Sequence, residues 1–156
     1  MINLYYYIGL ALVSFGVACY AIFNKRDTYP LSTYLVFYLF STGISWTGEF
    51  FVLILFNAYQ YNTGIFESQW AQSILGHMLL NTTMFPAAAI MWVAYSFGYG
   101  YFAVISFVFV AIEYWFHYLG LYTHNWWRYY MSVTNLCLFL VITGWWFHRM
   151  NKKRYG

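Results

Sequence analysis

The chain has 156 residues, of which 63% are hydrophobic, 27% aromatic and only 7% charged. Soluble domains are about 45–50% apolar and roughly 25% charged, so this composition excludes an ordinary soluble domain. Disordered chains are polar and poor in aromatic residues, so that class is excluded as well. The net charge of +3 rests on too few basic residues to indicate a nucleic-acid partner. We predict an all-α polytopic membrane protein that folds as a single domain over residues 1–156.

Apolar segments long enough to cross a bilayer as helices, which takes about 20 residues, follow one another along the chain. The first ends at Asn24-Lys25-Arg26-Asp27, before Pro30, which cannot continue a helix interior. The third contains Pro86, where we expect a kink. None of the segments shows the alternating polarity of a barrel strand. The sequence therefore predicts five transmembrane helices, over about residues 4–23, 33–59, 70–97, 101–119 and 130–147.

Basic residues indicate how these helices are oriented. Lys25 and Arg26 follow the first segment, and four more basic residues follow the fifth. Five crossings place both clusters on one side, which the positive-inside rule assigns to the cytoplasm. A four-span arrangement would separate the clusters. We expect a multi-pass plasma-membrane protein in the lipid bilayer, its N-terminus and loops 60–68 and 120–129 outside. Aromatic belts at the two interfaces are predicted from Trp126, Trp127, Tyr129, Tyr130, Trp145 and Trp146, and the C-terminal cluster is Arg149, Lys152, Lys153 and Arg154.

A few ionisable and amide side chains interrupt the apolar segments. A charged group at the centre of a bilayer costs about 2.5–3.5 kcal/mol on insertion scales. Such groups face a protein interior or a wet cavity and are functional candidates by default. The candidates for ligand or proton binding are Glu49, His77, Asn81, Glu113 and His117.

Helical spacing aligns these candidates with other polar residues, because residues three or four apart share a helix face. At about 1.5 Å per residue, Glu49 lies roughly 15 Å below the outer end of the predicted second span. The other candidates lie at overlapping levels, so we predict a polar pocket in the outer half that opens outward. His124 and His148, at the interfaces, are expected to be solvated. The polar rows are Tyr38, Ser41 or Thr42, Ser45 and Glu49; Gln69, Ser73, His77 and Asn81; Ser106, Glu113 and His117; and Ser132 with Asn135.

Two interpretations of the polar rows stay open. Serine, threonine, asparagine and histidine can bond between helices and only stabilise the bundle. Glu49 and Glu113 are harder to explain in this way, because a less costly residue could fill that role. They could still be structural if burial protonates them or if His77 or His117 pairs with them.

Three chemistries could use the candidate residues. Glu113 and His117, four residues apart, could bind zinc or iron with His77 as a third ligand. Glu–His pairs can also exchange protons in transport or in general acid–base catalysis. His77 and His117 could ligate a haem, although the chain has no attachment motif. The identity of any cofactor stays open. The sequence contains no Gly-rich phosphate loop, no GxSxG elbow and no plausible cysteine nucleophile.

Several short motifs support a family resemblance. They are Met84-Phe85-Pro86, Glu113-Tyr114-Trp115, Leu119-Gly120-Leu121-Tyr122 and Trp126-Trp127. With these motifs the chain resembles an uncharacterised group of small multi-pass membrane proteins of Gram-positive bacteria, over about half of its length. The resemblance implies a membrane topology and draws attention to Glu113. It implies no mechanism, because that group has no assigned activity.

Three functions are compatible with the sequence. The leading hypothesis is binding or translocation of a small polar ligand, or of protons, through Glu49, His77 and Glu113. The alternative is a membrane-embedded enzyme, metal-dependent in one version, that acts on a lipid or on a substrate at the outer face. The third is a non-catalytic subunit whose aromatic surface packs on other membrane proteins or on further copies of the chain.

Overall fold

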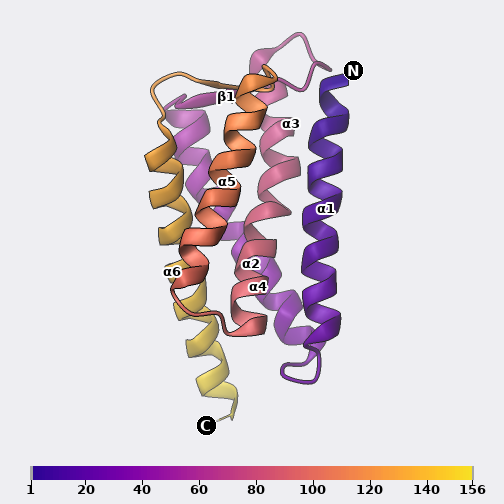
Figure 1. Ribbon diagram of the computed structural model, residues 1–156, viewed down its shortest axis with the longest axis vertical. Coiled ribbons are helices and arrows are strands. Elements are labelled where there is room, and N and C mark those ends of the chain that lie inside the picture. The colour runs from indigo at the N-terminus through magenta and orange to yellow at the C-terminus, as the bar shows by residue number, and fades with distance from the viewer. Residues whose placement is uncertain (1, 156) are drawn as a thin grey trace.

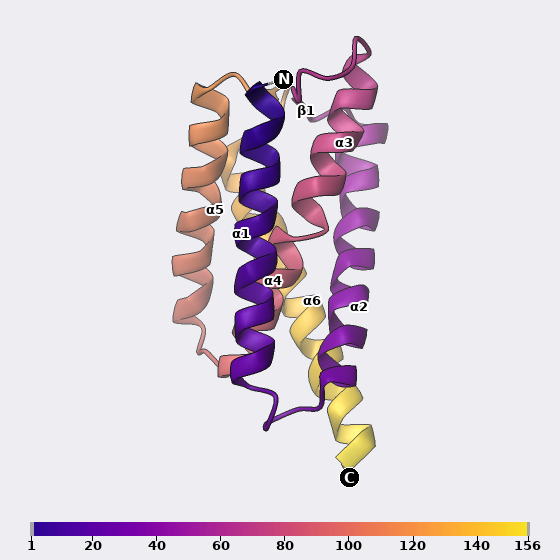
Figure 2. The ribbon, with the colours of Figure 1, turned by 90° about the vertical axis from the view of Figure 1, so that its right-hand side faces the viewer.

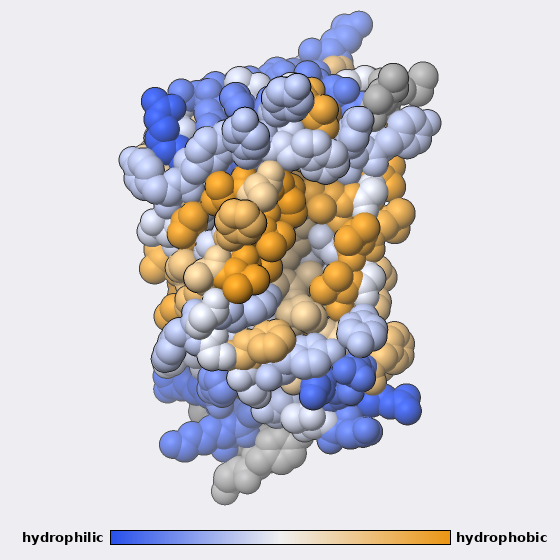
Figure 3. Space-filling model, viewed as in Figure 1, coloured by the Kyte–Doolittle hydropathy of each residue, from blue (hydrophilic) through white to orange (hydrophobic). Residues whose placement is uncertain are grey.

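The computed structural model describes residues 2–155, and side chains from residue 3 to residue 152. Within that part, five helical segments are long and apolar enough to cross a membrane, and they run up and down as a bundle (Figure 1). The predicted all-α bundle is confirmed. Hydrophobic residues form a band between two hydrophilic ends (Figure 3). The elements are α1 (Ile2–Asn24), α2 (Leu31–Glu49), the π-helix η1 (Phe50–Leu55), β1 (Tyr59–Tyr61), α3 (Gln69–Asn81), α4 (Met84–Tyr95), α5 (Gly100–Tyr118), β2 (Tyr122–His124) and α6 (Tyr129–Tyr155).

The two ends of the bundle differ in character. The end that holds the start of α1 and the two strands is called the ribbon end, and the opposite end, with the C-terminus, is called the basic end (Figure 1). At the basic end, Lys25 lies over the ring of Tyr95 at 4.8 Å, and Asn24 donates to the Tyr95 hydroxyl at 2.8 Å. The side chains of Lys153 and Arg154 lie outside the described part of the chain. The described members of both basic clusters share this end.

The third span is broken between α3 and α4, which Figure 2 shows as an offset. The break lies at Thr82 and Thr83, in the turn before Pro86, which is where a proline interrupts a helix because it cannot bond the carbonyl four residues earlier. Pro86 itself is the third residue of α4. A proline in the first turn costs no hydrogen bond, since that N–H has no partner within the helix. At the break, the Tyr38 hydroxyl donates to the carbonyl oxygen of Thr82 at 2.6 Å.

The second span ends earlier than predicted and changes its helix type. The α-helix stops at Glu49, and η1 continues to Leu55 as a π-helix. Such segments often occur at functional sites. Glu49 is six residues from this end of the span, so at about 1.5 Å per residue it lies roughly 9 Å deep, and not roughly 15 Å. Asn57, in the left-handed conformation at φ 45°, then turns the chain toward β1.

A two-stranded antiparallel ribbon, formed by β1 and β2, lies across the ribbon end. Tyr61 pairs with Tyr122 and Tyr59 with His124, where the sequence predicts loops and, at Tyr59, the end of the second span. Side chains alternate between the faces of a strand, so Tyr59 and Tyr61 are both buried. The carbonyl oxygen of Ala58 accepts three backbone N–H groups, from residues 125 to 127, at 3.0–3.2 Å. These bonds fix the ribbon to the segment that follows it.

The centre of the bundle is α4. Residues 87–90, three alanines and Ile90, are all buried in succession, as expected of a helix enclosed on every side. Small residues let neighbouring helices approach closely, and α4 packs against α1, α2 and α6. The span formed by α3 and α4 is 56% buried, against 11% for α5. Helix α5 is therefore peripheral.

Candidate functional site

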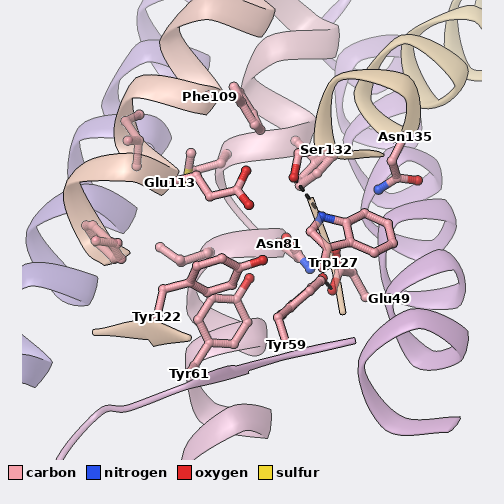
Figure 4. Close-up of a pocket in the computed structure, with 15 residues that line it drawn as sticks. Glu49, Tyr59, Tyr61, Asn81, Phe109, Glu113, Tyr122, Trp127, Ser132 and Asn135 are labelled. Atoms are coloured by element: carbon pink, nitrogen blue, oxygen red, sulfur yellow. Dashed lines mark hydrogen bonds between the residues drawn. The ribbon is translucent and has the colours of Figure 1, made fainter. Parts of the chain in front are cut away.

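A cavity of about 90 Å³ lies beneath the ribbon, with room for several water molecules. Helices α2 to α6, both strands and the segment before α6 contribute to its wall. The labelled polar side chains converge on it from several elements (Figure 4). The lining consists of Glu49, Tyr59, Tyr61, Leu80, Asn81, Met84, Phe85, Phe109, Ile112, Glu113, Phe116, Tyr122, Trp127, Ser132 and Asn135.

Glu49 enters the cavity from the end of α2 and is 5% exposed. The Tyr59 hydroxyl donates a hydrogen bond to its carboxylate. Nδ1 of His77 lies 4.0 Å from the same carboxylate oxygen, and the Asn81 amide donates to that Nδ1 over 2.7 Å. Asn81 lines the cavity, whereas His77 lies behind it. Three of the predicted residues thus form one connected group.

Glu113 enters the same cavity from α5. A hydrogen bond of 2.8 Å joins its Oε1 to Nε2 of His124, and the two side chains are 12% and 10% exposed. The prediction that His124 is merely solvated is wrong. The ring of His124 also stacks on His117, with 5.1 Å between centroids and 15° between planes. The ribbon therefore supplies the partner of the second carboxyl group.

His117 does not reach the cavity. Its side chain is exposed, and its Nδ1 lies 3.0 Å from the carbonyl oxygen of Tyr122. His117 is one turn beyond Glu113, close to the C-terminal end of α5. The expectation that His117 converges with the other candidates is therefore wrong. Its role is to contact the ribbon.

The predicted metal arrangement of Glu113, His117 and His77 does not form. Glu113 is bound to His124, His117 contacts the ribbon, and His77 lies beside Glu49 on another wall. Among the described residues, no group of three or more histidine, cysteine, aspartate or glutamate side chains could hold a metal ion. Glu113 and His117 both contact His124, the first through a hydrogen bond and the second by ring stacking, but only Glu113 lines the cavity.

Three tyrosines of the ribbon, Tyr59, Tyr61 and Tyr122, project into the cavity between the two carboxyl groups (Figure 4). Burial raises the pKa of all three hydroxyls well above the usual value of 10. The negative charge of Glu49 raises the pKa of Tyr59 and Tyr61 further. These hydroxyls are therefore neutral donors and acceptors. None of the three was predicted as a site residue, because Tyr59 stands at the end of the predicted second span and Tyr61 and Tyr122 in predicted loops, although Tyr59-Gln60-Tyr61 shows the alternation of a half-buried strand.

Other members of the polar rows hold the ribbon in place. The Ser73 hydroxyl accepts from the backbone N–H of Tyr61 at 3.2 Å, and the Gln69 amide donates to the Tyr61 carbonyl at 2.7 Å. These contacts are the polar bonding between segments that the first interpretation predicts. Trp127, expected in an interfacial belt, is 8% exposed and donates through Nε1 to the Ser132 hydroxyl at 2.7 Å. It is part of the cavity wall.

The lining residues differ in how accessible they are. The ribbon tyrosines and Trp127 are only 3–8% exposed, so they cover the cavity at the ribbon end. Lining residues on α5 and α6 are partly exposed, among them Ile112, Glu113, Ser132 and Asn135. The accessible side of the cavity is therefore the side that α5 and α6 form.

Comparisons with known proteins found no match: no family model, no curated protein and no solved structure is similar to the chain.

Proposed function

We propose that this protein binds a small polar solute in the cavity between Glu49 and Glu113, and moves that solute or protons across the membrane. One observation carries the proposal: two of the four acidic residues of the chain line the same cavity. Ionisable groups in membrane spans are costly and usually mark ligand or proton pathways. Tyrosine hydroxyls and the amides of Asn81 and Asn135 surround these carboxyl groups, and few polar groups in an apolar wall are typical of ligand sites.

We infer that the ribbon end faces the outside of the plasma membrane and the basic end faces the cytoplasm. The positions of both basic clusters support this orientation. It can be tested in a cysteine-free background with single cysteines at position 28, at the basic end, and at position 66, in the loop after β1. A membrane-impermeant maleimide should label Phe66→Cys in intact cells, and Thr28→Cys only after the cells are opened. The reverse pattern would refute the orientation.

Solute binding can be tested by thermal unfolding of the purified protein in nanodiscs, with small solutes of positive, negative and zero charge. A ligand at 100 times its Kd stabilises a protein by about 2.7 kcal/mol, which is readily measured. The stabilisation should disappear in Glu49→Gln and in Glu113→Gln. Glu67→Gln is the matched control, because Glu67 is exposed and does not line the cavity. Equal stabilisation of all the variants would show that the solute binds elsewhere.

A second candidate function is a membrane-embedded enzyme that acts on a lipid. The partly exposed lining of α5 and α6 supports it, because a lipid headgroup could reach Glu113 from that side. The Glu113–His124 pair is within hydrogen-bonding distance and could serve in general acid–base catalysis. Mass spectrometry of lipids incubated with the protein would reveal a product that Glu113→Gln fails to form. An unchanged lipid profile with the unmodified protein would eliminate this candidate.

A further inference from the structure

The cavity has a chemical bias that indicates the class of its ligand. Its ionisable lining consists of two carboxyl groups and the tyrosine hydroxyls, and none of the lysine and arginine side chains that the structure describes lines it. The histidines beside the carboxyl groups, His77 and His124, are outside the lining as well. The cavity thus presents negatively charged hydrogen-bond acceptors to a ligand, and no lysine or arginine of the described chain lines it. This favours a ligand of positive charge.

Aromatic rings form much of the remaining wall. Phe109 of α5 lies across the cavity from the ribbon tyrosines, and Trp127 closes one side (Figure 4). Phe116 of α5 also lines the cavity. The face of an aromatic ring attracts a cation within about 6 Å of its centroid, and quaternary ammonium groups are commonly recognised by such aromatic cages. A bare metal ion would instead require a nearly complete set of oxygen ligands. The wall therefore suits an organic cation better than a metal ion.

Both carboxyl groups keep acceptor capacity for a ligand. An ionised carboxylate has about four lone-pair sites. Glu49 bonds to Tyr59 and interacts with the Asn81 amide, and Glu113 bonds to His124 and interacts with the Tyr122 hydroxyl. Two partners each leave acceptor sites on both carboxyl groups. Asn135 also lines the cavity and makes no side-chain hydrogen bond to another described residue. Its amide is free to bind a polar group elsewhere on the ligand.

We propose that the ligand is a small organic ammonium ion, held between Glu49 and Glu113 and enclosed by the aromatic wall. This inference rests on the proposed function, because it names the class of solute that the same cavity takes. A volume of about 90 Å³ suits a head group of a few heavy atoms. The ammonium group can belong to a free solute or to a lipid headgroup that enters beside α5 and α6. The chemistry of recognition is the same for both sources.

The test compares choline with 3,3-dimethyl-1-butanol, which has the same shape but no charge. Binding is measured by calorimetry on the unmodified full-length protein in nanodiscs of phosphatidylglycerol, a lipid without an amine. We expect choline to bind with a Kd at least about tenfold lower than that of the neutral analogue. A tenfold change in Kd is about the contribution of one hydrogen bond or contact to a charged group. Equal binding of the two compounds would overturn the inference. This comparison needs no variant, so it does not depend on whether a substituted protein folds.

Variants locate the charge that choline contacts. Glu113→Gln keeps the shape of the side chain and should weaken choline binding at least about tenfold, while Glu67→Gln should leave it unchanged. An unchanged affinity in both Glu49→Gln and Glu113→Gln would overturn the inference. If an anionic or neutral solute binds in a glutamate-dependent way, the proposed function stands and the ammonium class fails. If no solute of any charge binds, both proposals fail.

The source of the ammonium group is decided by the lipid. Nanodiscs that contain phosphatidylethanolamine are compared with nanodiscs of phosphatidylglycerol alone. If the headgroup occupies the cavity, phosphatidylethanolamine should raise the Tm and suppress the effect of choline. If the ligand is a free solute, the effect of choline should be the same in both lipids. Each result supports an ammonium ligand and identifies where it comes from.

Discussion

The half of the bundle next to the ribbon end (the ribbon half) and the half next to the basic end (the basic half) are built by the same spans but differ in their interior. In the basic half, Phe37, Leu140 and Phe147 are at most 1% exposed, and Phe40 stacks on Trp146 with 3.9 Å between centroids. This half is packed, and it consists largely of alanines and rings. The ribbon half encloses a cavity whose carboxyl, amide and hydroxyl groups need partners. A solute that reaches the cavity therefore still faces a closed core on the way to the basic end.

The largest expected difference between the halves concerns alkaline pH. The folded state holds Tyr59, Tyr61 and Tyr122 at a raised pKa, so their contribution to stability is complete below pH 10 and is lost as the pH rises above 10. Three such groups lower the free energy of unfolding by up to about 4 kcal/mol per pH unit in that range. Denaturant unfolding between pH 9 and 11 measures the slope. Tyr122→Phe should reduce it by up to about 1.4 kcal/mol per pH unit, the contribution of one such group.

The control for that experiment is Tyr118→Phe, which alters an exposed tyrosine outside the cavity. It should leave the slope as it is in the unmodified protein. Absorbance at 295 nm, followed in the same samples, should show that the cavity tyrosines ionise only when the protein unfolds. An unchanged slope in Tyr122→Phe would mean that this hydroxyl reaches water in the folded state.

Two buried glycines allow a direct comparison of packing in the two halves. A Cβ on Gly76 would meet the Cβ and Cγ of Tyr61 at 2.6 and 2.7 Å, so β1 would have to move. Overpacking a well-packed site costs about 1–3 kcal/mol, and we expect Gly76→Ala to lie at the upper end. Because β1 lines the cavity, this substitution should also weaken ligand binding. Thermal unfolding and calorimetry of the same variant measure both effects.

Gly144 marks the corresponding contact in the basic half. There a Cβ would meet the ring of Trp92 at 2.1 Å, and a ring at the end of a side chain can move more easily than a strand. We expect Gly144→Ala to cost about 1–2 kcal/mol and to leave ligand binding unchanged. Gly43→Ala is the control, since nothing lies within 4 Å of its added Cβ. Weakened binding in Gly144→Ala would show that the two halves are coupled.

The sequence was sufficient for the part of the architecture that composition and helical periodicity determine. Long apolar runs predicted the helical segments, and the spacing of Ser73, His77 and Asn81 predicted their common buried face. The cost of ionisable groups in apolar segments singled out Glu49 and Glu113, which line one cavity in the structure. Each of these inferences depends on local spacing and on the type of residue.

The missed features depend on contacts between distant segments. Two three-residue strands are too short to be recognised singly, and Tyr59 meets His124 only because the segments that follow η1 and α5 pair with each other. The partner of Glu113 is thus a histidine of the ribbon and not His117 on its own helix. The π-helix after Glu49 gives no signal in hydropathy. Local periodicity cannot show which residues such long-range pairing brings together.

The smallest expected effect concerns the polar row of α2, and it shows whether bound water follows this row into the basic half. The hydroxyls of Ser41 and Ser45 are buried and have no hydrogen-bond partner among the described residues, whereas the Thr143 hydroxyl donates to the Phe139 carbonyl at 2.8 Å. Removing an unpartnered buried hydroxyl is neutral or stabilising, while removing a bonded one costs about 0.5–1.5 kcal/mol. Ser45→Ala should therefore keep or raise the Tm, and Thr143→Val should lower it. A clear fall in Tm for Ser45→Ala would mean that an ordered water binds this hydroxyl, and the polar row would then extend from Glu49 past the cavity toward the basic end.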